Sequence, residues 1–275
     1  MEIGFVFTNY NNSAYSILSI ESLATTPAWR DCRVVIVDNA SQEKDLNLLA
    51  QLSESHPEID VIYNDSNLGY FSGLNVGIEF IRNKHPNIHI VVIGNNDLVF
   101  PANFFELVHA NSGLFEKHPV VSPDIVTLDD IHQNPHAVAE FTALRLFLWK
   151  LYYADYHIAL VLRALAKLTR LLTERKDYTN FSNAGPIAQG FGACYLLGPL
   201  FWQNFKTLWA PTFLMHEEFF FSEQLKSKGY MVYYTPGITV RHHCHASVGN
   251  LPSRRLWELS RDAYLIMLKN PAPPE

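Results

Sequence analysis

Asp97 stands where a carboxylate could hold a metal ion. It ends the polar triplet Asn95-Asn96-Asp97, directly after the strongly apolar segment 90–93. A carboxylate at the end of a buried strand can bind Mg²⁺ or Mn²⁺, which prefer oxygen ligands and commonly bridge to substrate phosphates. An Asn-rich turn is the structural alternative, and the triplet alone does not separate the two interpretations.

A pair of adjacent acids, Glu217 and Glu218, follows His216 in an aromatic segment and precedes a helix-like pattern. Carboxylates close to apolar rings are candidates for a raised pKa, which suits a general base. Capping of a helix N-terminus by glutamate is the alternative. Both acids are therefore candidate catalytic residues.

Three histidines and one cysteine occupy positions 242–245. Their spacing is too tight for all four to hold one zinc ion with normal geometry, and the sequence has no C-x-x-C partner. We expect instead that one of these histidines completes the metal site begun by Asp97.

Asp38 and Asn39 follow the apolar run 34–37 and precede Ser41. A carboxylate at that strand end can accept an N–H from a nucleobase, with Asn39 and Ser41 as further polar contacts. A plain cap for the next helix is the alternative.

The segment 67–77 carries three glycines four residues apart, Gly69, Gly73 and Gly77, leading into a helix. Glycine permits close backbone approach, and a helix N-terminus favours a phosphate. Helix packing would explain the same glycines. Neither G-x-G-x-x-G nor G-x-x-x-x-G-K occurs, so hydride transfer and a P-loop lose their main support.

The elements that must position these residues alternate between strand and helix patterns over the first 125 residues, which predicts an α/β fold with a mostly parallel sheet. Strands are expected at 3–7, 33–37, 60–63 and 88–93, and helices at 13–23, 43–52 and 73–82. Each strand ends in polar residues, which should meet in one crevice at the carboxyl edge of the sheet. Further on, the patterns predict a helix at 217–228, two strands at 231–234 and 238–241, and a helix at 253–268.

Residues 131–183 have a different character, with apolar residues at helical spacing and basic residues between them. Two interpretations stay open. The segment is either a helical insertion that covers the core or a basic amphipathic surface, over 144–176, that contacts an anionic membrane or a partner.

The overall composition limits the function classes. The 275 residues carry a net charge of −6, so no chain-wide basic field exists to attract nucleic acid. The three cysteines are few and far apart, as is typical of a reducing cytoplasm. The sequence has neither a signal-peptide pattern at its start nor an apolar stretch of spanning length. We therefore expect a cytoplasmic protein.

Taken in order, these blocks resemble glycosyltransferase family 2, and in particular its rhamnosyltransferase-like members that build bacterial cell-surface polysaccharides. The resemblance implies one GT-A domain over 1–275, a Rossmann-like nucleotide-binding fold. Within it, 1–125 would be the nucleotide-sugar-binding half, 131–183 a helical insertion, and 186–270 the acceptor-binding and catalytic half.

The resemblance also implies roles for single residues. Asp97 and His242 would bind the Mg²⁺ or Mn²⁺ cofactor, and Glu217 and Glu218 fall on the family's acidic pair, in which the second acid is the usual base. Glu218 is therefore the expected base. The expected donor contacts are Thr8, Tyr10, Asp38, Asn39, Asn67, Gly69, Asn75 and Asn96.

The sequence departs from the family pattern at three positions. Asn95 replaces the first acid of D-x-D, Glu218 is one methylene longer than the commoner Asp, and Phe220 stands where many relatives carry another Asp. These changes bear on metal binding, on the position of the base and on acceptor contacts.

The implied reaction is an inverting transfer of a sugar from a UDP- or dTDP-linked donor to a hydroxyl of a glycan or lipid-linked acceptor. A nucleotidyltransferase is one alternative, but residues 8–14 contain neither the Gly nor the Lys of a triphosphate-gripping loop. A non-catalytic nucleotide- or sugar-binding module is the other.

Overall fold

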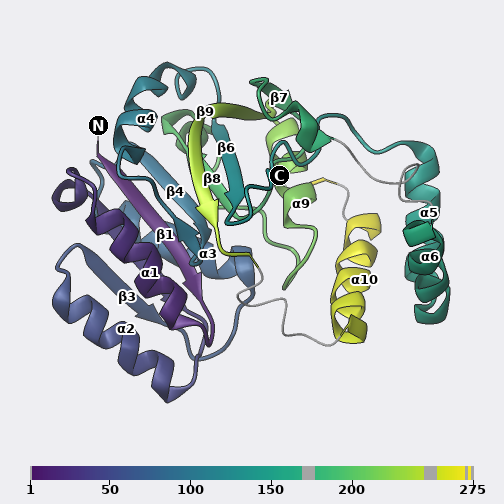
Figure 1. The fold of residues 1–275 in the computed structure, drawn as a ribbon, viewed down its shortest axis with the longest axis horizontal. Helices are drawn as coiled ribbons and strands as arrows, with labels where there is room; N and C mark the ends of the chain where they lie inside the picture. Colours follow the sequence, from purple (N-terminus) through teal and green to yellow (C-terminus); the bar gives the residue numbers. More distant parts are fainter. Residues whose placement is uncertain (1, 169–176, 245–252, 270–271, 274–275) are drawn as a thin grey trace.

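A computed structural model describes residues 2–168, 177–244, 253–269 and 272–273. The described residues form a nine-stranded mixed sheet in the order β3-β2-β1-β4-β8-β6-β9-β5, and β7 pairs with β9 outside this path (Figure 1). Helices cover both faces of the sheet. The expected α/β class is confirmed.

The first half of the sheet is parallel, and its strands are apolar because both faces are buried. Its four strands are β1 (Ile3–Asn9), β2 (Arg33–Asp38), β3 (Ile59–Tyr63) and β4 (Ile90–Asn95). The helices between them are α1 (Ser13–Ala24), α2 (Glu43–Ser55) and α3 (Tyr70–Lys84). A short 3₁₀ turn, η1 (Trp29–Asp31), precedes β2.

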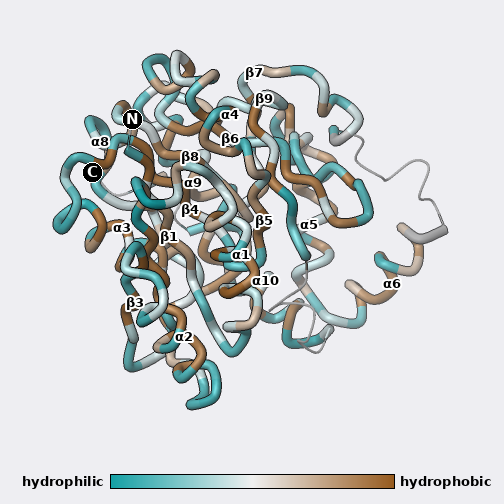
Figure 2. The backbone as a smooth tube through the Cα atoms, turned by 60° about the vertical axis from the view of Figure 1, so that its left-hand side comes forward, coloured by the Kyte–Doolittle hydropathy of each residue, from teal (hydrophilic) through white to brown (hydrophobic). Residues whose placement is uncertain are grey.

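The two faces of the sheet have separate apolar cores. Alternate residues of β1 and β2 pack against α1, α2 and α4 (Phe104–Ala110) on one face. The other face packs against α3, α8 (Pro199–Asn204) and α9 (Glu217–Lys226). In Figure 2 the hydrophobic colouring follows the strands through the centre of the molecule. The carboxyl ends of β1, β2 and β4 therefore open at one edge of a rigid layered body.

The second half of the sheet switches direction. β8 (Cys194–Leu197) pairs antiparallel with both β4 and β6 (Val120–Thr127). β9 (Val232–His242) runs parallel to β6, and the two-residue β5 (Leu98–Val99) pairs antiparallel with β9. The sequence patterns did not indicate β6 or β8, because Pro123 and Asp124 interrupt one and the other has only four residues.

The structure corrects one strand prediction. The segments 231–234 and 238–241 belong to a single strand, β9, with an irregularity inside it. Pro123 pairs with Thr235 and the next residue, Asp124, pairs with Thr239, so residues 236–238 bulge out of the ladder. The Pro236-Gly237 dipeptide reads as a turn in sequence, but it bends the strand without ending it.

Three helices lie together at one side of the molecule (Figure 1): α5 (Ala143–Ala154), α6 (Tyr156–Leu168) and α10 (Ser253–Lys269). The indole N–H of Trp257 in α10 donates to the Tyr152 carbonyl of α5 at 3.1 Å. The segment that connects β6 to α5 forms an isolated antiparallel bridge with the segment before β8. In this bridge the N–H of Ala137 donates to the Gln189 carbonyl at 2.9 Å. The remaining short elements are η2 (Ser112–Leu114), η3 (Asp177–Asn180) and β7 (Gly185–Ile187).

Within the described residues, every helix is too short or too polar to cross a bilayer.

Close packing of α3 on the sheet generates a stability prediction for Gly77. A Cβ at this position would lie 2.4 Å from Val6 Cγ1 and 2.9 Å from Val37 Cγ2. Overpacking of this kind costs about 1–3 kcal/mol. We expect Gly77→Ala to lower the free energy of unfolding by this amount in urea denaturation.

Gly113→Ala is the matched control, because a Cβ there has nothing within 4 Å. Equal stabilities of the two variants would contradict the packing argument.

Candidate active site

The pairing of β5 with β9 brings Asp97 and His242 together. Leu98 pairs with His242, and the N–H of His243 donates to the Asp97 carbonyl at 2.9 Å. Asp97 Oδ1 then lies 3.0 Å from His242 Nε2, and both side chains are almost fully buried. Asp97 and His242 are 145 positions apart in the sequence and are neighbours in the fold, as expected of two ligands of one cation.

Two further side chains set the orientation of the His242 ring. Gln133 Oε1 lies 2.7 Å from Nδ1 and accepts its proton, while Asn95 Nδ2 lies 3.3 Å from Nε2 and donates to it. The Gln133 oxygen can only accept, so Nδ1 carries a proton. Nε2 lies within hydrogen-bonding distance of both the Asp97 carboxylate and the Asn95 amide, so the imidazole and the carboxylate are in direct, buried contact.

One imidazole and one carboxylate fit a divalent ion that takes its other ligands from a diphosphate and water. Over the described ranges no group of three His, Cys, Asp or Glu side chains gathers to form a complete protein cage. Of the 242–245 cluster, His245 lies outside the described residues. Gln133 was not anticipated, and no sequence pattern would have indicated it.

A buried polar network joins the carboxyl ends of β1, β2 and β4. Asn9 is fully buried, and its Nδ2 donates to Asp38 Oδ1 at 2.8 Å. Its Oδ1 accepts from Asn96 Nδ2 at 3.0 Å and from the Ser16 hydroxyl at 2.9 Å. Asn96 also exchanges hydrogen bonds with Asn12. The network holds the loops at this edge in one arrangement.

Asp38 and Asn39 are both buried and bonded within the chain. The second Asp38 oxygen accepts from the Ser41 N–H at 2.8 Å, as in a cap. Asn39 donates to the Gly69 carbonyl at 2.9 Å and accepts from Asn64 Nδ2 at 2.9 Å. These residues shape the crevice, and their contact with a donor stays a prediction.

The glycine segment packs against the loop that precedes α9. Gly69 has φ of +88°, and a Cβ there would lie 2.0 Å from the Phe213 carbonyl oxygen. The same oxygen accepts from the Tyr70 N–H at 3.1 Å. Asn67 Oδ1 accepts from the Gly69 N–H at 2.9 Å. The close packing alone requires glycine at position 69.

The Asn75 side chain binds the backbone of Leu208, which lies between α8 and α9. Its Nδ2 donates to the Leu208 carbonyl at 2.9 Å, and its Oδ1 accepts from the Leu208 N–H at 2.8 Å.

Thr8 pairs with Val37 and Asn95 near the end of β1, and Tyr10, which follows this strand, is 45% exposed. Tyr10 is thus the most accessible of the expected donor contacts at this strand end.

The two adjacent glutamates have different surroundings at the start of α9. Glu217 is buried, and its Oε1 accepts from the Met215 N–H at 2.9 Å. Burial and the neighbouring Glu218 raise the pKa of Glu217 to about 8. Glu218 is partly exposed, and its Oε1 accepts from the Gly192 N–H at 3.2 Å. Glu217 is therefore protonated at neutral pH, and Glu218 is the acid that solvent and ligands can reach.

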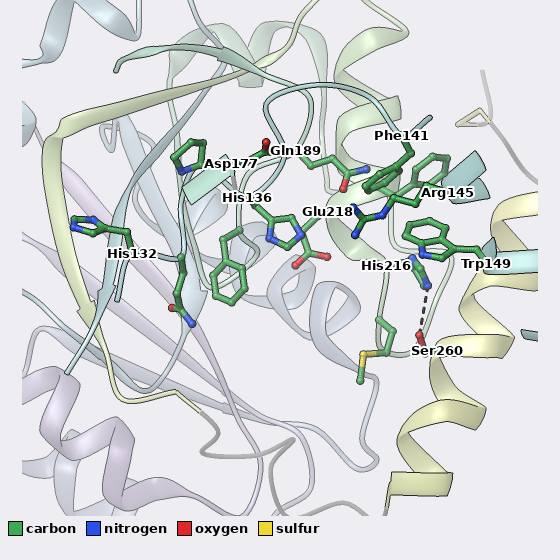
Figure 3. A pocket seen from close by; sticks show the side chains of 15 residues that line it. His132, His136, Phe141, Arg145, Trp149, Asp177, Gln189, His216, Glu218 and Ser260 are labelled. Atoms are coloured by element: carbon green, nitrogen blue, oxygen red, sulfur yellow. Dashed lines mark hydrogen bonds between the residues drawn. The ribbon is translucent and has the colours of Figure 1, made fainter. Parts of the chain in front are cut away.

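Glu218 points into a cavity of about 560 Å³ (Figure 3). His136 and Arg145 are directed toward the same space, and Phe141, Trp149 and Phe219 add aromatic walls. Gln133 also lines the cavity while it bonds His242. The cavity therefore adjoins the Asp97–His242 pair.

His216 connects the cavity to α5 and α10. It has φ of +62°, immediately before α9. Its Nε2 lies 3.2 Å from the Tyr153 hydroxyl and 3.5 Å from the Ser260 hydroxyl, and the two hydroxyls lie 2.7 Å apart. Burial lowers the pKa of His216, which favours the uncharged ring. The sequence offered no signal for this contact between distant helices.

The family described as glycosyl transferase family 2 matches residues 5–167, more than half of the chain. The chain belongs to glycosyltransferase family 2. No curated protein sequence matches it significantly. The match includes Asp38, the glycine segment and Asp97, whereas His242 and the two glutamates lie beyond it.

Solved GT-A structures share the fold of this family 2 chain. S. aureus TarS, residues 1-349, has a TM-score of 0.55 at 12% identity over 88% of the chain. GalNAc-T7, solved with UDP, GalNAc and Mn²⁺, has 0.57 at 11% over 88%. Mannosyltransferase PcManGT from Pyrobaculum calidifontis, solved with GDP-Man and Mn²⁺, has 0.57 at 14% over 99%. The chain covers 60%, 44% and 66% of these three structures, respectively.

The environment of Glu217 generates a pH prediction. The folded chain keeps this proton up to about pH 8, whereas the ordinary pKa is 4.5, so between these values the folded state binds more protons than the unfolded state. The stability contribution is therefore complete below the ordinary pKa and is lost as pH rises, by up to about 1.4 kcal/mol per pH unit. Glu217→Gln should remove this loss, giving a smaller fall in urea-unfolding free energy between about pH 5.5 and 7.5.

Glu116→Gln, at an exposed position, is the control and should keep the wild-type dependence. A Glu217→Gln profile parallel to wild type would show that the side chain is ionised in the fold.

Proposed function

We propose that the protein is an inverting glycosyltransferase that uses a nucleotide-diphosphate sugar, UDP- or dTDP-linked, and a hydroxyl of a glycan or lipid-linked acceptor. The observation that carries the proposal is the buried Asp97–His242 pair beside the cavity that contains Glu218. This arrangement supports a single displacement, in which the pair would hold the leaving group next to an accessible base.

The comparisons support the donor class. Membership of family 2 supports sugar transfer, and two structures with the same fold were solved with UDP or GDP-Man and Mn²⁺. In this chain Asp97 and His242 would hold the divalent cation, Mg²⁺ or Mn²⁺, which when bound neutralises charge on a diphosphate leaving group. Thr8, Tyr10, Asp38, Asn39, Asn67, Gly69, Asn75 and Asn96 remain the proposed donor contacts.

One carboxylate of the chain, Glu218, supplies the proton transfer. Glu218 accepts the proton of the acceptor hydroxyl as that oxygen attacks the anomeric carbon. The bond from this carbon to the diphosphate oxygen breaks, and its electron pair leaves with the nucleoside diphosphate. Attack opposite the leaving group inverts the anomeric centre. Glu217, protonated and bonded to the Met215 N–H, supports the helix start and is not a competing base at neutral pH.

The proposed cellular role is synthesis of bacterial cell-surface polysaccharide by a rhamnosyltransferase-like enzyme in the cytoplasm. Residues 144–176 would contact the inner face of the plasma membrane peripherally. Of these, 169–176 lie outside the described residues. We also propose that 1–125 binds the nucleotide sugar, that 131–183 is a helical insertion, and that 186–270 binds the acceptor and carries the catalytic residues.

Metal-dependent donor binding tests the roles of Asp97 and His242. Calorimetry with UDP, dTDP, GDP and CMP, each with and without Mn²⁺, should detect UDP or dTDP binding that requires the metal. Asp97→Ala and His242→Ala should weaken it by about 10-fold or more, since each removes one of two protein ligands.

The exposed Asp129→Ala is the control and should bind as wild type. Metal dependence unchanged in Asp97→Ala would remove the assigned role, and no nucleotide binding at all would indicate a non-catalytic protein.

Glu218→Gln tests the base. This variant keeps the size of the side chain but cannot accept a proton, so donor binding should stay unchanged while turnover falls by about 10²-fold or more. Turnover is measured as release of nucleoside diphosphate in the presence of acceptor.

Glu217→Gln is the matched control, because Glu217 is already protonated at neutral pH. If Glu217→Gln is the more severe change, the choice of base is wrong.

A further inference from the structure

The outward face of α5 is apolar and exposed. Leu144, Phe147, Leu148 and Leu151 repeat at i, i+3, i+4 and i+7, so they share one face of the helix. They are 68%, 56%, 41% and 37% exposed, in that order. No residue of α5 is buried. A contiguous apolar stripe on the surface marks a candidate interaction site.

The helix that follows repeats the pattern. In α6, Ile158, Val161 and Leu165 share a face and are 42%, 59% and 51% exposed, while only Ala159 is buried among the residues whose side chains are described. α5 and α6 contact one another and lie at the edge of the molecule in Figure 1, and α6 also lies at the edge in Figure 2. Together they form an exposed apolar hairpin.

The charge of this hairpin is opposite to that of the rest of the chain. Residues 143–168 contain four basic residues and one acid, a net charge of +3 within a chain of net charge −6, although one of the basic residues, Arg145, faces the cavity. The acid, Asp155, caps α6, and its Oδ1 accepts from the His157 N–H at 2.8 Å. Lys150 is exposed on α5. Apolar side chains with interleaved basic ones complement an anionic lipid surface.

The inward face of α5 is part of the cavity. Arg145 and Trp149 line it together with Glu218. Trp149 also packs against His216, with ring centroids 5.5 Å apart. The helix α5 therefore has an apolar face on the outside of the molecule, and its other face forms a wall of the cavity.

We propose that the α5–α6 hairpin docks on an anionic lipid bilayer and holds the Glu218 cavity at the lipid surface. The acceptor that enters the cavity is then a membrane-anchored molecule whose polar head reaches Glu218, a consequence that rests on the proposed function. Helices of 12 and 13 residues are about 18 and 20 Å long, shorter than the hydrocarbon core. The hairpin therefore lies in the interface and does not cross the bilayer.

A second copy of the chain fits this surface less well. A symmetric contact would place two hairpins of net positive charge against one another. An anionic bilayer satisfies the apolar faces and the basic residues at the same time.

The experiment is co-sedimentation of the full chain, without donor, with vesicles of phosphatidylglycerol and phosphatidylcholine or of phosphatidylcholine alone. Binding should be stronger to the anionic vesicles and should weaken with added salt. Phe147→Glu, Val161→Glu and Lys150→Glu should each reduce binding by about 10-fold or more, because each places a negative charge at the lipid surface.

Two variants elsewhere on the surface are the controls. Leu128→Glu changes an apolar side chain that is 50% exposed, and Lys117→Glu reverses an exposed charge. Both should bind vesicles within about twofold of wild type. Nucleotide binding by Phe147→Glu, measured by calorimetry, should equal wild type, which separates failure of docking from failure of the proposed function.

Equal binding to both vesicle types, or wild-type binding by the three hairpin variants, would overturn the proposal. So would the absence of vesicle binding together with a dimer in analytical ultracentrifugation that Phe147→Glu dissociates, because the hairpin would then bind a second copy.

Discussion

The arrangement of the site depends on the buried amide of Asn96. This side chain lies in the network with Asn9 and Asn12, where leaving a donor or acceptor unpaired would cost about 1–3 kcal/mol. Because Asn96 is held inside the fold, its two neighbours, Asn95 and Asp97, turn the other way and contact His242. The middle residue of the triplet therefore anchors the loop, and the outer two form the site.

Strand pairing completes what the network begins. His242 is the last residue of β9, a strand that stays continuous through the bulge at 236–238 and so reaches β5. The connection after β6 adds Gln133, which orients the ring. Three segments far apart in the chain thus bring one imidazole and one carboxylate into buried contact beside Asn95.

Two adjacent glutamates acquire different chemistry from their surroundings. Glu217 is turned into the protein and keeps its proton, while Glu218 lies in the cavity beside Gly192, where a Cβ would be only 2.7 Å from its Oε1. Environment and not residue type sets which acid can act as a base. The same cavity takes its outer wall from α5, so a helix with no buried residue still shapes the space around Glu218.

The sequence by itself determined the α/β class and the three helices and four strands of the parallel half, because apolar runs and helical spacing report local burial directly. It also indicated Asp97, His242 and the glutamate pair as a group through the family resemblance. It did not reveal β6, β8 or the continuity of β9, because a proline, an acid and short length mask strands whose partners lie far away in the chain. Tertiary structure alone decided that Gln133 orients His242 and that Glu217 is buried while Glu218 is accessible, since both depend on contacts between segments with no common local pattern.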